Sequence, residues 1–124
     1  INRRQRQMCI RDSSYGYNNL VVDTLNFQIL KQLFKPVIFD VTHSLQLPGG
    51  LGSSTGGRRE YVLSLAKAGM SQSIAGLFLE AHPNPDEAKC DGPCALPLSY
   101  LDEFLNQIKD LDDFVKGQNN LEIK

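Results

Sequence analysis

The sequence predicts an α/β fold in which short strands alternate with amphipathic helices. Two apolar runs, at residues 37–39 and 76–79, have the length of strands, and a carboxylate, Asp40 or Glu80, follows each one directly. Short, wholly apolar runs are typical of parallel strands buried on both faces. Apolar residues at helical spacing lie before, between and after the two runs. We therefore expect a parallel sheet covered by helices, with polar side chains at the carboxyl ends of its strands.

The composition excludes several classes of partner. The chain has 124 residues, with 13 basic and 14 acidic side chains and a net charge of -1, so nothing favours nucleic acid or an anionic membrane. No apolar run approaches the roughly 20 residues that span a bilayer. The start lacks the apolar segment of a signal peptide, and we expect a cytoplasmic protein. Cys9, Cys90 and Cys94 fit neither a zinc-knuckle spacing nor a disulfide framework, which favours reduced thiols.

The first third of the chain is predicted to hold a non-native segment, a loop and a helix. Residues 1–13 are basic, show no hydrophobic period and are set aside as non-native. The Gly- and Asn-rich stretch at 15–20 is typical of a loop. The helix that follows is expected to end at Lys35-Pro36 and to pack through Leu25, Ile29, Leu30 and Leu33.

A long loop is expected over residues 42–57, which carry five glycines. This composition would equally suit a linker, but the position after a strand end favours a flexible lid over a site. A helix then begins at residues 57–60, and its expected packing face is Val62, Leu63, Leu65, Ala66, Ala68 and Gly69.

The last helix is predicted to begin near residues 97–99 and to stop at Gly117. Its apolar stripe is expected to be Leu101, Phe104, Leu105, Ile108, Leu111 and Val115. The main domain would thus occupy residues 14–118, with a polar tail at 119–124.

Three side chains form a candidate site. His43 and Glu80 follow the two predicted strands, and Asp91 lies in the next loop. Because the carboxyl ends of adjacent parallel strands lie at one edge of a sheet, the three residues can meet. One histidine with two carboxylates suits a divalent ion with open positions. The same group is more often a hydrogen-bonded structural network, so both interpretations stay open.

Four motifs occur in a fixed order along the chain. They are Tyr-Gly-Tyr-Asn-Asn-Leu-Val-Val-Asp at 15–23, Asp-Val-Thr-His-Ser-Leu-Gln-Leu-Pro-Gly-Gly at 40–50 with Gly-Gly-Arg-Arg-Glu at 56–60, Gly-Leu-Phe-Leu-Glu-Ala-His-Pro at 76–83, and Lys-Cys-Asp-Gly-Pro at 89–93 with Leu-Pro-Leu at 96–98. Together they resemble the 3-deoxy-D-manno-octulosonate-8-phosphate (KDO-8-phosphate) synthases. Four ordered motifs are far more specific than one short pattern.

The resemblance implies a (β/α)8 TIM barrel, a fold that typically needs about 250 residues. The chain would then be the C-terminal part of a barrel, holding its last two strands and the surrounding helices. The implied reaction is an aldol-type condensation of phosphoenolpyruvate with D-arabinose 5-phosphate that gives KDO 8-phosphate and phosphate, in lipopolysaccharide biosynthesis. The whole enzyme would be a homotetramer, and this part alone is expected to be inactive.

The resemblance also implies roles for individual residues. His43, Glu80 and Asp91 match catalytic positions that bind a metal in metal-dependent members, together with a cysteine that this chain lacks. The motif at 89–93 and Lys116-Gly117 look more like the metal-independent type, so no cofactor is the first expectation and a divalent metal the second. The implied substrate-binding positions are Gln46, Ser54, Thr55, Asn18 and Arg11. The family usually has Ser at position 55, Phe at 15 and Glu-Arg-Gly at 10–12, where this chain has Thr55, Tyr15 and Ile10-Arg11-Asp12.

Two other functions stay open. A small metal-dependent hydrolase could use His43, Glu80 and Asp91, and it predicts metal binding and hydrolysis by the isolated chain. A non-catalytic fragment would instead associate through uncovered strand edges.

Overall fold

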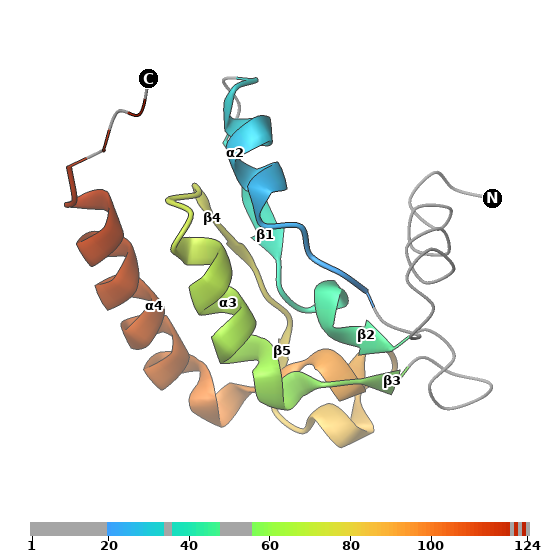
Figure 1. The fold of residues 1–124 in the computed structure, drawn as a ribbon. Helices are drawn as coiled ribbons and strands as arrows, with labels where there is room; N and C mark the ends of the chain where they lie inside the picture. The colour runs from blue at the N-terminus through green and yellow to red at the C-terminus, as the bar shows by residue number, and fades with distance from the viewer. Residues whose placement is uncertain (1–19, 34–35, 48–55, 120, 122, 124) are drawn as a thin grey trace.

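The computed structural model describes residues 20–33, 36–47, 56–119, 121 and 123 (Figure 1). The predictions for residues 1–13, for Cys9 and for the tip of the proposed lid lie outside these residues. The same holds for four predicted substrate-binding positions: Arg11, Asn18, Ser54 and Thr55.

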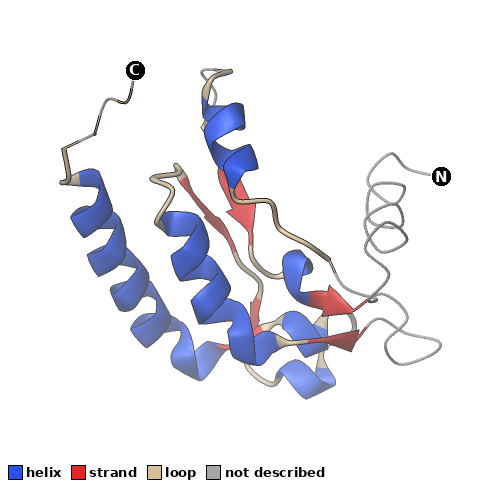
Figure 2. Cartoon of the chain, viewed as in Figure 1, coloured by secondary structure: helices blue, strands red, loops and turns tan. Residues whose placement is uncertain are grey.

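The described elements include both strands and helices, as expected of an α/β chain (Figure 2). The α-helices are α2 (Leu25–Lys31), α3 (Val62–Met70) and α4 (Leu101–Lys116). The strands are β1 (Ile38–Asp40), β2 (Gln46–Leu47), β3 (Gly56–Gly57), β4 (Gly76–Phe78), β5 (Ala81–His82) and β6 (Leu96–Pro97). Short 3-10 turns connect them: η1 (His43–Leu45), η2 (Arg59–Tyr61), η3 (Pro85–Glu87), η4 (Gly92–Cys94) and η5 (Leu98–Tyr100).

The two predicted strands pair in parallel, which confirms the central expectation for the sheet. β1 and β4 are in register, with Phe39 opposite Leu77 and Asp40 opposite Phe78. The helix α3 lies between them in the chain. Two further pairs are short: β5 pairs with β6 in parallel, and β2 pairs with β3 in antiparallel orientation. The described residues form these three two-stranded sheets and no closed barrel.

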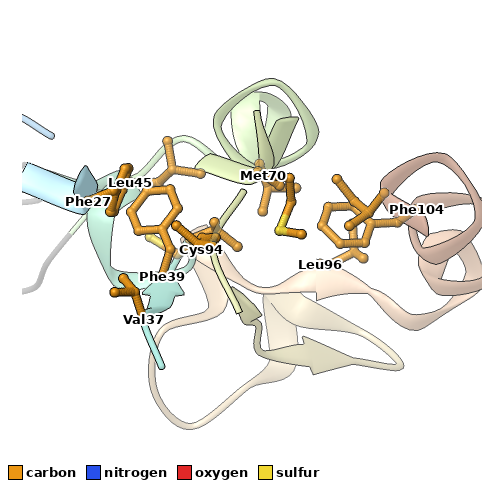
Figure 3. Close-up of a cluster of buried hydrophobic side chains, with 13 residues drawn as sticks. Phe27, Val37, Phe39, Leu45, Met70, Cys94, Leu96 and Phe104 are labelled. Atoms are coloured by element: carbon orange, nitrogen blue, oxygen red, sulfur yellow. The ribbon is translucent and has the colours of Figure 1, made fainter. Parts of the chain in front are cut away.

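The hydrophobic core lies between the β1–β4 sheet and the helices (Figure 3). Phe39 is almost fully buried and meets the ring of Phe27 edge-on, with 4.9 Å between centroids. The α3 helix approaches β1 so closely that a Cβ at Gly69 would lie 2.4 Å from the Phe39 ring. The core continues through Met70 to Phe104 of α4, which lies beside α3 (Figure 1).

Burial of β1 on both faces was the wrong expectation. Phe39 is 6% exposed, but its neighbour Ile38 is 57% exposed, and Phe78 on β4 is 45% exposed. Successive side chains of a strand point to opposite faces. The described helices pack on the Phe39 side, so the opposite side of this sheet keeps its apolar residues in solvent.

The packing expected of α2 was also wrong. Phe27 is its buried residue, whereas Leu25, Ile29 and Leu33 are at least half exposed. The α-helix ends at Lys31, before the predicted stop at Lys35-Pro36. With seven residues it presents a single large side chain to the core.

The two later helices follow the predictions more closely. α4 ends at Lys116 with Gly117 as its cap, and Phe104 and Ile108 of the predicted stripe are buried. In α3, four residues are buried: Val62, Ala66, Gly69 and Met70. Two predicted packing residues, Ala68 and Leu105, are exposed instead. None of the described helices is long and apolar enough to cross a membrane.

The segment expected as one irregular loop has ordered ends. It opens with η1 and β2, and β2 pairs antiparallel with β3, which places Gln46 opposite Gly57. A strand made of two glycines has none of the residue types that favour strands, and for this reason the composition indicated only a loop.

Candidate active site

The turn after β1 is organised by Asp40. Its Oδ1 accepts hydrogen bonds from the backbone N–H groups of Thr42 (3.1 Å) and His43 (3.0 Å). Its Oδ2 lies 2.7 Å from Nδ1 of His43. Because one ring nitrogen is held by Asp40, the other nitrogen, Nε2, is the one presented to neighbouring groups, and it lies 3.5 Å from Oε1 of Glu80.

Glu80 is held by the same turn. Its backbone N–H donates to Oγ1 of Thr42 at 2.8 Å, and the Thr42 side chain is fully buried. Phe78, the last residue of β4, stacks on the His43 ring with 5.9 Å between centroids. The imidazole is therefore fixed by a hydrogen bond at its edge and by an aromatic ring on its face.

Asp91 occupies a left-handed backbone conformation, with φ 53° and ψ 13°. Asp tolerates this region better than most residues. Its carbonyl accepts hydrogen bonds from the N–H groups of Cys94 (2.9 Å) and Ala95 (3.0 Å). The next residue must be glycine, because a Cβ at Gly92 would lie 2.3 Å from the carbonyl oxygen of Pro85. This tight turn directs the Asp91 side chain back toward the ends of β1 and β4.

These three residues meet as the topology predicted. One ligand atom from each of His43, Glu80 and Asp91 lies within 4.8 Å of the other two, and all three residues are partly buried. The arrangement brings one imidazole and two carboxylates to the carboxyl end of the parallel strands. Their catalytic roles remain predictions.

The carboxylates raise the pKa of His43 above its ordinary value of 6.5. Partial burial alone would lower this pKa. The hydrogen bond to Asp40 and the negative charges of Asp40, Glu80 and Asp91 together outweigh the burial, since each favours the protonated ring. His43 therefore keeps its proton to a higher pH than a free imidazole does.

The two described cysteines are free thiols, in agreement with the expectation of reduced cysteines. Burial raises the pKa of the Cys94 thiol. A hydrogen bond to Asp91, with the charge of that carboxylate, raises the pKa of the exposed Cys90 thiol. Both thiols stay protonated at neutral pH, and this disfavours them as nucleophiles or metal ligands.

Gln46, predicted near a sugar, is almost fully buried and donates from Nε2 to Oδ1 of Asp91 at 2.5 Å. His82 lies outside the cluster, with Nδ1 against the backbone of Asn84. Sequence reasoning missed the hydrogen bond from Glu80 to Thr42. A threonine two residues after a strand gives no signal of such a contact, which joins positions 38 residues apart.

The donor set fits a divalent metal ion. Asp40 occupies Nδ1 of His43, and a carboxylate at the second ring nitrogen is the usual way in which a metal-bound histidine is oriented. Nε2 of His43 and the two carboxylates would then be the ligands, and three protein ligands leave positions open for water or substrate.

Comparison with known proteins places the chain in a family. Residues 2–117 match the family model described as the DAHP synthetase I family. The chain belongs to the DAHP synthetase I family. The four motifs all lie within the matched residues.

Two curated relatives carry the same name, which confirms the resemblance seen in the four motifs. A Hahella chejuensis protein is 66% identical over 115 residues, which is 93% of this chain and 41% of that protein. A Pseudomonas fluorescens protein is 68% identical over 110 residues, or 89% of this chain and 39% of that protein. Both are named 2-dehydro-3-deoxyphosphooctonate aldolase. This chain thus spans about two fifths of the length of the relatives that it matches.

Proposed function

We propose that this chain is the C-terminal part of a KDO-8-phosphate synthase, an enzyme that condenses phosphoenolpyruvate with D-arabinose 5-phosphate. The single observation that carries the proposal is the meeting of His43, Glu80 and Asp91 within 4.8 Å at the strand ends. The names of the relatives support it, because 2-dehydro-3-deoxyphosphooctonate is the product of this condensation.

The condensation needs one proton donor and one proton acceptor. The C3 carbon of phosphoenolpyruvate forms a bond to the aldehyde carbon of the pentose, and the aldehyde oxygen takes up a proton. Water then adds at C2 and gives up one proton. The bond from C2 to the phosphate oxygen breaks as the new C2 hydroxyl becomes a carbonyl, and the proton of that hydroxyl leaves with the phosphate. The two protons balance, so the site must hold one and accept one.

The cluster can supply both functions. The raised pKa of His43 favours the protonated ring, and the proton on Nε2 can pass to the aldehyde oxygen. The carboxylates of Glu80 and Asp91 can orient the attacking water and accept its proton. Asp40 keeps the imidazole in place throughout, through its bond to Nδ1.

Both substrates are phosphorylated, whereas the three side chains include two carboxylates. Cations must offset that charge. Of the described arginines, Arg59 already pairs with Asp86. We therefore place most of the phosphate-binding cations of the whole enzyme in the part of the relatives that this chain does not span, and we expect no condensation by the chain alone.

A metal would be held by His43, Glu80 and Asp91 if the whole enzyme uses one. Such an ion would act as a Lewis acid that polarises the pentose aldehyde. We propose that the enzyme works without it, because the motif at residues 89–93 is closer to the metal-independent members. Treatment with EDTA should then leave activity unchanged, and a loss of activity that Mn²⁺ restores would contradict this part of the proposal.

A chimera tests the function. In the Hahella chejuensis relative, the matched segment is replaced by this chain, and phosphate release and the eight-carbon product are measured with both substrates. We expect activity within about tenfold of the parent relative, since the two segments are 66% identical over 115 residues. A folded but inactive chimera beside an active parent would contradict the proposal.

A second assay tests the hydrolase alternative. The isolated chain is incubated with Mn²⁺ and a chromogenic phosphate ester, alone and as the Glu80→Gln variant. Ester hydrolysis that is lost in the variant would favour a small hydrolase. We expect no hydrolysis in either sample.

A further inference from the structure

The β2–β3 pair carries Gln46 to Asp91, which lies 45 residues later in the chain. Gln46 is opposite Gly57 in this pair, and Gly57 lies against the η4 turn. A Cβ at Gly57 would lie 2.2 Å from Sγ of Cys94 and 2.7 Å from the backbone of Pro93. Only glycine permits this approach. The close contact therefore sets the distance between β2 and the turn that begins at Asp91.

The Gln46 amide is committed to the Asp91 carboxylate. The side chain is 8% exposed, and Nε2 donates to Oδ1 of Asp91 at 2.5 Å. A hydrogen bond to an ionised group is stronger than one between neutral groups. A buried amide that lost this acceptor would remain desolvated, so the two side chains constrain each other.

The segment from Asp40 to Gln46 holds every member of the cluster. Asp40 binds Nδ1 of His43, and Thr42 accepts the backbone N–H of Glu80. Gln46 completes the set by binding the carboxylate of Asp91. Asp40 contacts the ring of His43 and Thr42 contacts the backbone of Glu80, whereas Gln46 contacts the carboxylate of Asp91 itself.

We propose that Gln46 is a positioning residue that orients the Asp91 carboxylate toward His43 and Glu80, and that it does not bind the pentose. This differs from the sugar contact that the family resemblance implies for Gln46. The kinetic part of the inference rests on the proposed condensation, while its structural part does not.

The structural part is tested by NMR on the intact chain. The side-chain amide of Gln46 is assigned through its loss in Gln46→Met, a variant of similar size that lacks the donor. We expect one amide proton to resonate downfield of the other glutamine side chains and to return to their range in Asp91→Ala. An unshifted Gln46 amide, or a shift that survives in Asp91→Ala, would overturn the inference.

The kinetic part is tested in the chimera. Loss of one hydrogen bond to a charged group should lower kcat in Gln46→Met by roughly 10- to 10²-fold, with the KM for arabinose 5-phosphate unchanged. The matched control is Gln107→Met on α4, which removes an amide bonded to Glu103 and Lys67, neither of them in the cluster, and should change neither constant. A raised KM for the pentose with normal kcat would show a sugar contact and overturn the inference.

Two outcomes are kept distinct. An inactive chimera that carries the unsubstituted chain counts against the proposed function alone, and the NMR result then decides the inference. If Gln46→Met does not fold, the exchanged pair Gln46→Glu with Asp91→Asn restores the hydrogen bond in the opposite direction. That pair must restore the fold without restoring kcat, and failure to restore the fold would overturn the inference.

Discussion

The two faces of the β1–β4 sheet differ sharply. On one face Phe39 packs against Phe27 and against the glycine of α3, and it is 6% exposed. On the other face Ile38 is 57% exposed and Phe78 45% exposed, and the polar cluster lies at the carboxyl end of this open side. The packed face holds the chain together, while the open face presents the chemistry.

This division explains why one short strand can serve two purposes. Successive side chains of β1 point to opposite faces, so Phe39 lies in the core while the adjacent Asp40 contacts His43. Changes on the packed face should therefore act on stability, and changes at the open end should act on activity. The first two predictions below would fail if the two faces were not separate.

The largest expected effect is on activity. In the chimera, Glu80→Gln should lower kcat by about 10²- to 10⁴-fold, the range for loss of one acid–base group. The free energy of unfolding of the chain should change by no more than about 0.5 kcal/mol. Glu103→Gln, at an exposed position of α4, is the control and should change neither quantity. If Glu80→Gln lowered the free energy of unfolding enough to explain its loss of activity, the separation of the two faces would be contradicted.

The next effect is on stability and compares neighbouring residues on opposite faces. Phe39→Ala should lower the free energy of unfolding by about 3–5 kcal/mol, because it leaves a cavity between sheet and helices. Ile38→Ala should lower it by less than about 1 kcal/mol, since little of this side chain is removed from water. Urea unfolding of the chain measures both. Similar losses would mean that the open face is covered in solution.

A smaller effect is expected where the two regions join. Gly57→Ala forces a Cβ into Cys94 and the Pro93 backbone, and overpacking of this kind costs about 1–3 kcal/mol of unfolding free energy. The same change should move Gln46 away from Asp91 and return its amide resonance to the range of the other glutamines. Gly76→Ala is the control, because the Cβ there meets only the flexible end of Ile38 at 3.4 Å. A neutral Gly57→Ala would contradict the close approach of β3 to η4.

The smallest effect is the pH dependence of stability. The folded chain raises the pKa of His43 above 6.5, so the protonated ring contributes stability that is fully present below about pH 6.5. That contribution is lost as the pH rises through the folded pKa. The unfolding free energy lost in His43→Gln should therefore be larger at pH 6 than at pH 9, as measured by urea unfolding with EDTA present. A loss that grows with pH would contradict the effect of the carboxylates.

The sequence predicted those features that depend on short-range pattern. The apolar runs that end in Asp40 and Glu80 indicated two parallel strands, and the carboxyl-end rule then brought Glu80 to His43. α4 was predicted well, because its long amphipathic stripe and Gly117 leave few alternatives. These features depend only on the spacing of apolar residues along the sequence and on the geometry of a strand.

What could not be predicted depends on contacts between distant segments. The period of α2 indicated a leucine face, but periodicity does not say which partner is present, and Phe27 became the buried residue. The glycines of β3 carry no strand signal, so the bond between Gln46 and Asp91 was hidden as well. The exposure of Ile38 depends on which elements cover the sheet, and the sequence of one strand does not contain that information.

One measurement tests most directly whether the cluster is a single site. The kcat of the chimera is measured for Glu80→Gln, for Asp91→Asn and for the two changes together. Residues that act as one unit are strongly non-additive, so the double variant should lose about as much activity as the more impaired single variant. If the two losses multiply instead, Glu80 and Asp91 act independently and the account of one shared site is wrong.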